Sequence, residues 1–229
     1  MSESILILGE SGTGKSTAIR TLDPKCTFIV NVIGKPLPFR GYKAKFKPVS
    51  KDGTEGNHFM CDDPHQIIKI LKFINEKRPD ITNVIIDDFG YVISNSFMRK
   101  AMMKGYDKYT DIGKEIFDVL EFTQNLREDL FCIFTMHTEI DKFGRSKPKT
   151  VGNMIDQYIC IEGKFTYCLH SLANEGNYKF LTNNHGQYMA KSPLGVFDDL
   201  VIDNDLQYVL DKINEFNNYV EEEEDIEQG

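Results

Sequence analysis

Eight residues near the start of the chain carry its clearest chemical signal. The run Gly9-Glu10-Ser11-Gly12-Thr13-Gly14-Lys15-Ser16 fits the pattern G-x-x-x-x-G-K-[ST] completely. Its glycines let backbone N–H groups turn inward around a phosphate, and a helix that starts after the loop adds its positive dipole. In such a loop Lys15 neutralises phosphate oxygens and Ser16 binds Mg²⁺. We therefore assign ATP binding to Gly9, Glu10, Ser11, Gly12, Thr13, Gly14, Lys15, Ser16 and Thr17.

Two adjacent carboxylates follow an apolar run, Val84 to Ile86, farther along the chain. A phosphate loop of this kind needs an acid at the end of a nearby strand to hold Mg²⁺, and Asp87 is placed to do so. Asp88, one residue later, is a candidate general base that polarises the attacking water. Asp88 is equally suited to cap a helix that begins at Phe89. Both roles of Asp88 remain open at this stage.

A third apolar run, Leu130 to Phe134, ends in the polar residues Thr135-Met136-His137-Thr138. Polar side chains at the carboxyl end of a central strand face the crevice in which open α/β sheets bind ligands. Thr135 or His137 is therefore a candidate sensor of the γ-phosphate. The alternative for His137 is an ordinary surface histidine.

The elements that must position these residues follow from the alternation of short apolar runs with helical patterns. The runs Ile5–Leu8, Val84–Ile86 and Phe131–Phe134 are apolar on both faces, as buried parallel strands are. We expect an α/β fold with a mainly parallel sheet flanked by helices and extended by C-terminal antiparallel strands. The expected helices are Lys15–Leu22, Pro64–Lys77 with Asp62 or Asp63 as cap, Phe89–Lys104, Asp111–Arg127 and Leu206–Asn217. The expected antiparallel strands are Gln157–Ile161, Lys164–His170 and Tyr178–Leu181.

The formal charge of −8 is concentrated at the C-terminus, where residues 221–229 hold six acids and no base. We expect residues 1–218 to form one domain and 219–229 to be a disordered acidic tail. The tail either competes with DNA for basic loops, recruits a single-strand-binding or replication protein, or only adds solubility.

Two basic segments, 34–57 and 138–153, stand out against the nearly neutral remainder of the chain, and we expect both to flank the nucleotide site. Both mix cations with aromatic residues, a combination typical of single-stranded DNA binding. Solvated surface loops are the alternative. The candidate DNA contacts are Lys43, Lys45, Lys47, Lys142, Arg145, Lys147 and Lys149.

The five cysteines form no C-x-x-C pair and are odd in number, which argues against a disulfide framework and a zinc knuckle. The chain shows neither a secretion signal nor an apolar stretch of membrane-spanning length. We expect a cytoplasmic protein with no membrane partner.

Taken together, the motifs resemble those of the RecA-like P-loop ATPases, in particular a compact phage-encoded group linked to recombination and single-strand annealing. The resemblance spans most of the first 200 residues and rests on Gly9–Ser16, Val84–Asp88, Lys108–Glu115, Thr135–Glu139 and Gly144–Gly152. It implies a RecA-like fold, Mg²⁺-dependent ATP hydrolysis, a homo-oligomeric ring or filament, and single-stranded DNA contacts from the loop at 141–152. For a phage-encoded member the location is the host cytoplasm.

Two features depart from that family's pattern. RecA-type enzymes carry a catalytic Glu just beyond the second strand, but residues 34–51 contain no acid, which leaves Asp88 as the candidate. Related enzymes also apply a basic residue of a neighbouring subunit to the γ-phosphate, and Lys191 matches that role, with Arg145 as a rival. The residues assigned to catalysis are Lys15, Asp88, His137 and Lys191.

Other functions share the phosphate loop. A nucleoside or nucleotide kinase needs an Arg-rich lid, but the six arginines here are scattered singly along the chain. A nucleotide-controlled loader of another DNA-processing protein, hydrolysing slowly, is the third possibility. We favour the DNA-dependent ATPase.

Overall fold

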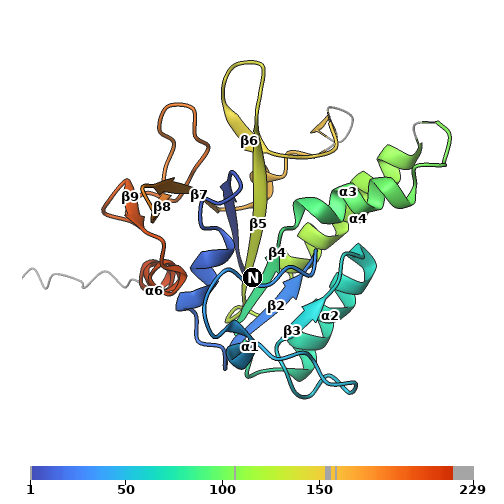
Figure 1. The fold of residues 1–229 in the computed structure, drawn as a ribbon, viewed down its shortest axis with the longest axis horizontal. Coiled ribbons are helices and arrows are strands. Elements are labelled where there is room, and N and C mark those ends of the chain that lie inside the picture. The colour runs from blue at the N-terminus through green and yellow to red at the C-terminus, as the bar shows by residue number, and fades with distance from the viewer. Residues whose placement is uncertain (1, 106, 153–155, 158, 219–229) are drawn as a thin grey trace, which may run out of the picture.

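Nine strands form one sheet in the computed structural model, which describes residues 2–105, 107–152, 156–157 and 159–218. The strand order is β3-β2-β4-β5-β1-β7-β8-β9, and β6 pairs with β5 (Figure 1). The strands are β1 (Glu3–Gly9), β2 (Thr27–Asn31), β3 (His58–Met60), β4 (Asn83–Asp87), β5 (Phe131–Ile140), β6 (Ser146–Pro148), β7 (Tyr167–Asn174), β8 (Asn177–Leu181) and β9 (Val201–Asp203).

The sheet is parallel from β3 through β7 and becomes antiparallel at β8 and β9. This confirms the expected mainly parallel sheet with C-terminal antiparallel strands. Because β5 lies between β1 and β4, the ends of these three strands meet at one edge of the sheet. The phosphate loop and the paired carboxylates lie where β1 and β4 end, and His137 lies on β5 opposite Gly9, the last residue of β1.

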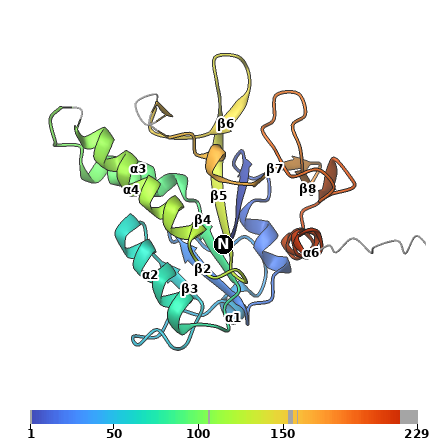
Figure 2. The same cartoon turned by 180° about the vertical axis from the view of Figure 1, so that it is seen from behind.

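Helices cover both faces of the sheet (Figures 1 and 2). Leu6 and Leu8 pack toward α2, α3 and α4, whereas Ile5 and Ile7 pack toward η1 and α6, since successive strand residues point to opposite faces. The helices are the 3₁₀ helix η1 (Ser16–Thr21), α1 (Tyr42–Lys45), α2 (Pro64–Lys77), α3 (Gly90–Arg99), α4 (Asp107–Gln124), the 3₁₀ helix η2 (Glu162–Lys164) and α6 (Leu206–Asn217).

The helices α2 and α6 agree with the sequence prediction, whereas η1 differs from it. Both α2 and α6 have the predicted limits, and the Asp63 side chain caps α2 by accepting a 3.0 Å hydrogen bond from the His65 N–H. The segment after the phosphate loop is a 3₁₀ helix rather than an α-helix. Pro24 disfavours helical backbone in the residue before it, which leaves little length for a regular helix.

Two segments between the parallel strands and the C-terminal strands differ from expectation. The stretch at 138–153 was expected to be a loop, but β5 continues to Ile140 and pairs with β6 as a hairpin. The predicted strand Gln157–Ile161 is absent from the described residues of that stretch, of which Tyr158 is not one. Ile159 and Ile161 are buried in the core instead, so their alternation reflects a packed loop.

No helix in the described part of the chain combines the length and hydropathy that crossing a membrane requires. The expected disordered tail at 219–229 lies outside the described residues.

Candidate functional site

The phosphate-loop sequence leaves β1 and turns sharply toward η1. Its residues Gly12 and Gly14 have φ values of 81° and 98°, a backbone conformation that side chains other than glycine rarely adopt. A Cβ at Gly14 would also lie 2.7 Å from the ring of Tyr178 on β8. The shape of the loop therefore depends on glycine at these two positions.

The C-terminal strands hold the loop from outside. The Ser171 hydroxyl on β7 donates a 2.5 Å hydrogen bond to the Thr13 carbonyl, and the Asn204 amide donates a 3.2 Å bond to the Gly14 carbonyl. Asn204 is buried and in turn accepts a 2.8 Å bond from Arg20. Sequence reasoning missed Ser171 and Asn204, because no local pattern marks a residue that supports a loop more than 150 positions away.

Lys15 is held inside the loop. Its ammonium donates to the carbonyls of Gly9 at 2.9 Å and Glu10 at 2.7 Å, and the residue is only 5% exposed. Burial lowers the pKa of Lys15 to about 8, although the charges of Asp88 and Asp87 oppose that shift. An anion bound beside this ammonium would stabilise its protonated form.

Asp87 joins the loop to two strands. Its Oδ1 accepts 2.8 Å hydrogen bonds from the Ser16 hydroxyl and from the Thr135 hydroxyl on β5. Burial raises the pKa of Asp87 to about 6, with a further contribution from the charge of Asp88, while the two hydroxyl bonds oppose the increase. The carboxylate is thus buried against neutral donors, an environment that favours a bound cation.

These residues fit a magnesium ion. Mg²⁺ commonly binds one or two protein oxygens together with substrate phosphates and water. The described residues contain no group of three or more His, Cys, Asp or Glu that could hold a metal by themselves. Ser16 and Asp87 are the residues of this chain that would hold it.

Asp88 faces His137 rather than capping a helix. Its φ is 64°, and its N–H donates a 2.7 Å bond to the Thr135 hydroxyl. The Asp88 carboxylate lies 3.4 Å from Nε2 of His137. The helix α3 begins at Gly90, and its cap residue Phe89 makes no side-chain capping bond. The capping interpretation of Asp88 is therefore not supported.

His137 connects Lys15 to Asp88. Its Nδ1 lies 3.4 Å from the Lys15 ammonium. Because an ammonium only donates, Nδ1 must accept, which assigns the proton of a neutral imidazole to Nε2, toward Asp88. The structure thus brings together Lys15, Ser16, Asp87, Asp88 and His137 from three neighbouring strand ends.

A cleft of about 490 Å³ opens beside these residues. The Lys35 ammonium lies 6.0 Å from the ring centroid of Tyr91, and that ring meets His137 edge-on at 6.1 Å. Sequence reasoning gave no role to Tyr91 or Ser94, since each is an ordinary residue in its local pattern, and it counted Lys35 only as part of the basic segment 34–57. The lining residues are Glu10, Ser11, Lys35, Gly90, Tyr91, Ser94, His137, Thr138 and Lys149.

The β5–β6 hairpin projects beyond the sheet at this same edge (Figure 1). The Asp141 carboxylate shapes its tip by accepting hydrogen bonds from the N–H groups of Phe143 and Arg145. Phe143 is 74% exposed, and the Lys142 ammonium lies 5.1 Å from its ring. The tip therefore presents an aromatic face between two cations.

The other two predicted DNA contacts on this segment are placed differently. Lys147 forms ion pairs with Glu139, at 3.1 Å, and with Asp156, so its charge is compensated within the fold. Lys149 lines the cleft, and its N–H donates a 2.8 Å bond to the His137 carbonyl. Lys149 therefore belongs to the cleft beside the phosphate-loop sequence as much as to the hairpin.

The basic segment with Lys43, Lys45 and Lys47 lies at the opposite edge of the sheet. The Asn57 amide donates to the Lys45 carbonyl and to the Pro24 carbonyl, just before β2 begins. Its three lysines are exposed, but the aromatic residues Phe39, Tyr42 and Phe46 pack edge-on against one another. The expectation that both basic segments flank the nucleotide site is therefore wrong for these three lysines, although Lys35, at the start of the same segment, lines the cleft.

Lys191 lies outside the cleft of its own chain. Its backbone N–H and carbonyl pair with Cys168 on β7, each at 2.8 Å. It does not line the cleft described above. A role at a γ-phosphate would require Lys191 from a neighbouring copy.

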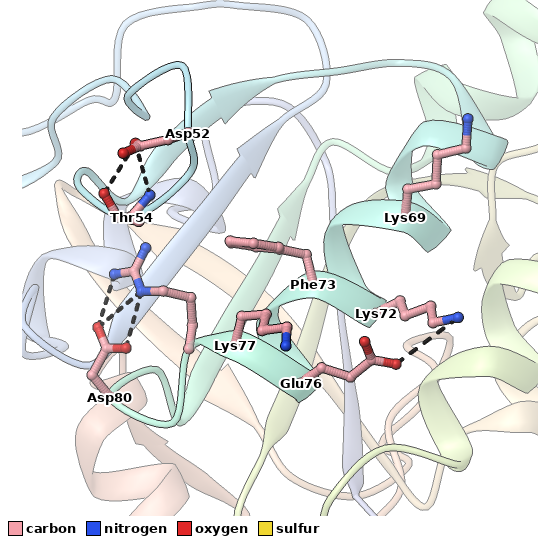
Figure 3. A pocket seen from close by; sticks show the side chains of 9 residues that line it. Asp52, Thr54, Lys69, Lys72, Phe73, Glu76, Lys77 and Asp80 are labelled. Carbon is pink, nitrogen blue, oxygen red and sulfur yellow. Dashed lines mark hydrogen bonds and ion pairs between the residues drawn. The ribbon is translucent and has the colours of Figure 1, made fainter.

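A second groove, of about 720 Å³, lies along the C-terminal half of α2, away from the phosphate loop (Figure 3). Phe73 and several lysines line it, but many of its charges are paired. Arg78 forms an ion pair with Asp80 at 2.8 Å, and Lys72 lies 3.9 Å from Glu76. Asp52 accepts hydrogen bonds from Ser50 and Thr54. The groove therefore contains no arrangement suited to catalysis.

Comparisons of the chain with protein-family models and with curated proteins find no match. The fold and the geometry around Lys15 and Asp87 thus carry the functional argument.

Proposed function

We propose that the chain is a RecA-like ATPase that binds and hydrolyses ATP with Mg²⁺ and acts on single-stranded DNA in recombination or annealing. The observation that carries this proposal is the 2.8 Å bond between Ser16 and Asp87, which joins a phosphate-loop sequence to a buried carboxylate. A structural Gly-rich turn would not require that carboxylate to be buried.

The roles of the protein residues follow from their positions. Lys15 and the loop N–H groups hold the phosphates, while Ser16 and Asp87 hold Mg²⁺, which would neutralise charge on the phosphate oxygens. Asp88 accepts a proton from the attacking water, directly or through one further water. His137 orients Asp88 through its Nε2 and senses occupancy of the site through its contact with Lys15.

The position of β5 supports the RecA-like part of the proposal. In the resemblance described above, this strand ends in the sensor residues, and here it lies directly between β1 and β4. Thr135 and His137 consequently contact residues on both neighbouring strand ends. A sensor placed elsewhere in the sheet would reach one of these ends but not both.

The hairpin supports the DNA part. Stacking of a base on an exposed aromatic residue between cations is a common mode of single-strand binding, and Phe143 with Lys142 and Arg145 has this form. The bond from the Lys149 N–H to the His137 carbonyl connects the base of the hairpin to the catalytic edge. DNA on the hairpin would therefore stimulate hydrolysis.

The oligomer completes the proposal. Lys191 does not line the cleft of its own chain. Its proposed action on a γ-phosphate therefore occurs between copies in a ring or filament. The acidic residues 221–227 would compete with DNA for the hairpin or recruit a single-strand-binding or replication protein.

A kinase is the second candidate, favoured by one observation. The 490 Å³ cleft beside the loop has Lys35 and Lys149 on its walls, where an acceptor phosphate or nucleoside would fit. A slow, nucleotide-controlled loader differs from both by its low turnover.

ATP turnover with and without single-stranded DNA separates these functions. The proposal predicts strong stimulation by DNA, abolished in Lys15→Ala and retained in Lys25→Ala, whose lysine is exposed and lies outside the site. Phosphoryl transfer to a nucleoside or nucleotide would instead establish the kinase. Slow turnover unaffected by DNA would favour the loader.

A further inference from the structure

The connection between α3 and α4 presents exposed apolar side chains at one end of the molecule. Met98, Met102 and Met103 are 67%, 94% and 44% exposed. Lone exposed apolar residues are common, but three flexible methionines at the tip of a projecting helical pair are typical of an adaptable binding surface. We call Met98, Met102 and Met103 the methionine tip.

The charge around the methionine tip is mainly positive. Lys104 is exposed beside it, and Lys108 lies against the rings of Phe97 and Tyr109 at just over 5 Å. Arg99 and Lys100 are already paired with acids of the same chain, and Asp107 offsets part of the remainder. The uncompensated charge at the tip is therefore chiefly that of Lys104 and Lys108.

The strand β9 lies at the other end of the molecule from the α3–α4 connection (Figures 1 and 2). It belongs to a second apolar surface. Leu194 is 98% exposed, and Leu200 and Val201 at β9 are 41% and 47% exposed. We call this set the β9 surface. A groove of about 510 Å³ adjoins it, lined by Gly195, Val196, Asp198, Lys212, Glu215 and Phe216.

The charge of the β9 surface is negative. Residues 194–205 contain four aspartates and no base. Asp198 and Asp199 are exposed, whereas Asp203 is paired with Lys179. The lysine that lines the groove, Lys212, is itself paired with Glu215.

We propose that the methionine tip of one copy docks on the β9 surface of the next copy, giving head-to-tail self-association. Both surfaces are apolar, their charges are opposite, and a groove on one accepts flexible side chains from the other. Since the two surfaces lie at opposite ends of one chain, each docked copy leaves both types of end available. Such contacts generate rings or open filaments.

This interface deepens the oligomeric part of the proposed function and rests on it. It also fits the proposed role of Lys191. Leu194 lies three positions after Lys191, and three residue steps of extended chain span about 10 Å. The distance along α3 from Gly90, at the nucleotide cleft, to Met98 is about 12 Å. The reach from Leu194 to Lys191 is thus similar in length to the path along α3 from Met98 to the cleft.

Two single variants test the interface, because each removes one half of it. Met102→Glu and Leu194→Glu alter almost fully exposed side chains. The first adds a charge that the acidic β9 surface repels, and the second puts a charged side chain in place of an apolar one that docking would bury. In sedimentation velocity with Mg²⁺ and a non-hydrolysable ATP analogue, we expect the wild-type chain to form assemblies that grow with concentration. Each variant alone should sediment as a monomer of 26.3 kDa.

Mixing the two variants distinguishes head-to-tail docking from other geometries. The intact tip of Leu194→Glu can dock on the intact β9 surface of Met102→Glu, and the remaining ends are both blocked. We therefore expect dimers and nothing larger. Ile140→Glu, exposed on the hairpin and outside both surfaces, should assemble like the wild type.

Three results would overturn the proposal: a monomeric wild type at every concentration, assembly of either variant as in the wild type, or a mixture that stays monomeric. Sedimentation reports the interface and turnover reports the nucleotide site. An inactive chain that assembles in this pattern would thus contradict the proposed ATPase but leave the interface intact.

Discussion

The hydroxyl of Ser16 donates a 2.8 Å hydrogen bond to the carboxylate of Asp87, 71 positions away in the chain. This bond holds the end of the phosphate loop against the end of β4. Thr135 donates to the same oxygen from β5, so a single buried carboxylate links three strand ends. The candidate nucleotide site is therefore already assembled in the protein alone.

Replacing that carboxylate should stabilise the fold and remove function. Burial raises the pKa of Asp87 to about 6, so Asp87→Asn should raise the free energy of unfolding at pH 7 by about 1–3 kcal/mol. The Asn carbonyl can still accept from Ser16 and Thr135. Mg²⁺-dependent turnover should fall at least about 100-fold, because a cation ligand is lost. Urea denaturation and turnover assays measure the two effects.

The stability gain of Asp87→Asn should depend on pH with a defined sign. Between about pH 4 and pH 6 the folded chain keeps the Asp87 proton longer than the unfolded chain does, so this group lowers stability as pH rises. The gain should therefore increase from pH 4 to pH 6 and then level off. Asp118→Asn, which alters an exposed ion pair, should change stability by less than about 0.5 kcal/mol. An Asp87→Asn protein less stable than wild type at pH 7 would contradict this account.

His137 should affect the chemical step more than nucleotide binding. His137→Ala removes the contact with Asp88, and we expect kcat to fall about 10- to 100-fold with KM changed only a few-fold. His137→Gln, which keeps a donor group, should recover part of kcat. Steady-state kinetics of the three proteins decide the point. A large rise in KM at unchanged kcat would show that His137 binds nucleotide instead.

Phe143 should carry much of the DNA affinity of the hairpin. Phe143→Ala removes one exposed stacking face and should weaken binding of oligo(dT) by about 1–3 kcal/mol in fluorescence anisotropy. Tyr208→Ala, an exposed aromatic on α6, is the matched control and should bind DNA normally. Equal affinities for Phe143→Ala and wild type would remove the hairpin from the DNA site.

The lysines at the opposite edge provide a comparison. Replacing Lys43, Lys45 and Lys47 together by Ala should leave DNA-stimulated turnover nearly unchanged, since their segment lies away from the cleft. Loss of stimulation in that triple variant would return this segment to the DNA-binding site.

Substitutions at Gly14 and Gly12 distinguish the backbone cost of a positive φ from a steric clash with Tyr178. Both have positive φ, so an added Cβ costs about 1–2 kcal/mol at either position. At Gly14 the Cβ also meets the Tyr178 ring at 2.7 Å, whereas at Gly12 no atom lies within 4 Å. Gly14→Ala should therefore be clearly more destabilising than Gly12→Ala in thermal unfolding. Tyr178→Ala should reduce that difference in the double variant, and equal destabilisation at the two glycines would contradict the contact.

The sequence predicted those parts of the fold that local patterns encode. The limits of α2 follow from the Asp63 cap and Pro64, and the apolar runs identify the parallel strands. The contact between Ser16 and Asp87 was predictable, because a phosphate loop of this sequence requires an acidic residue at the end of a nearby strand.

Contacts between distant segments were not predictable in this way. Asn204 supports Gly14 from the far end of the chain, and its residue type suits a turn equally well. The basic stretch at 43–47 was misplaced because charge composition does not tell which edge of a sheet a loop occupies. Lys147 was predicted to contact DNA, but its charge is already paired with that of Asp156, nine residues later in the chain.

Nucleotide binding by the isolated chain tests the central claim most directly. In calorimetric titrations with Mg²⁺ and a non-hydrolysable ATP analogue, the wild type should bind one nucleotide per chain. Lys15→Ala should bind at least about 100-fold more weakly, because a buried ammonium that faces the phosphates is lost. Absence of binding to the wild type, or equal affinity of the two proteins, would show that the loop at Gly9–Ser16 is not a nucleotide site.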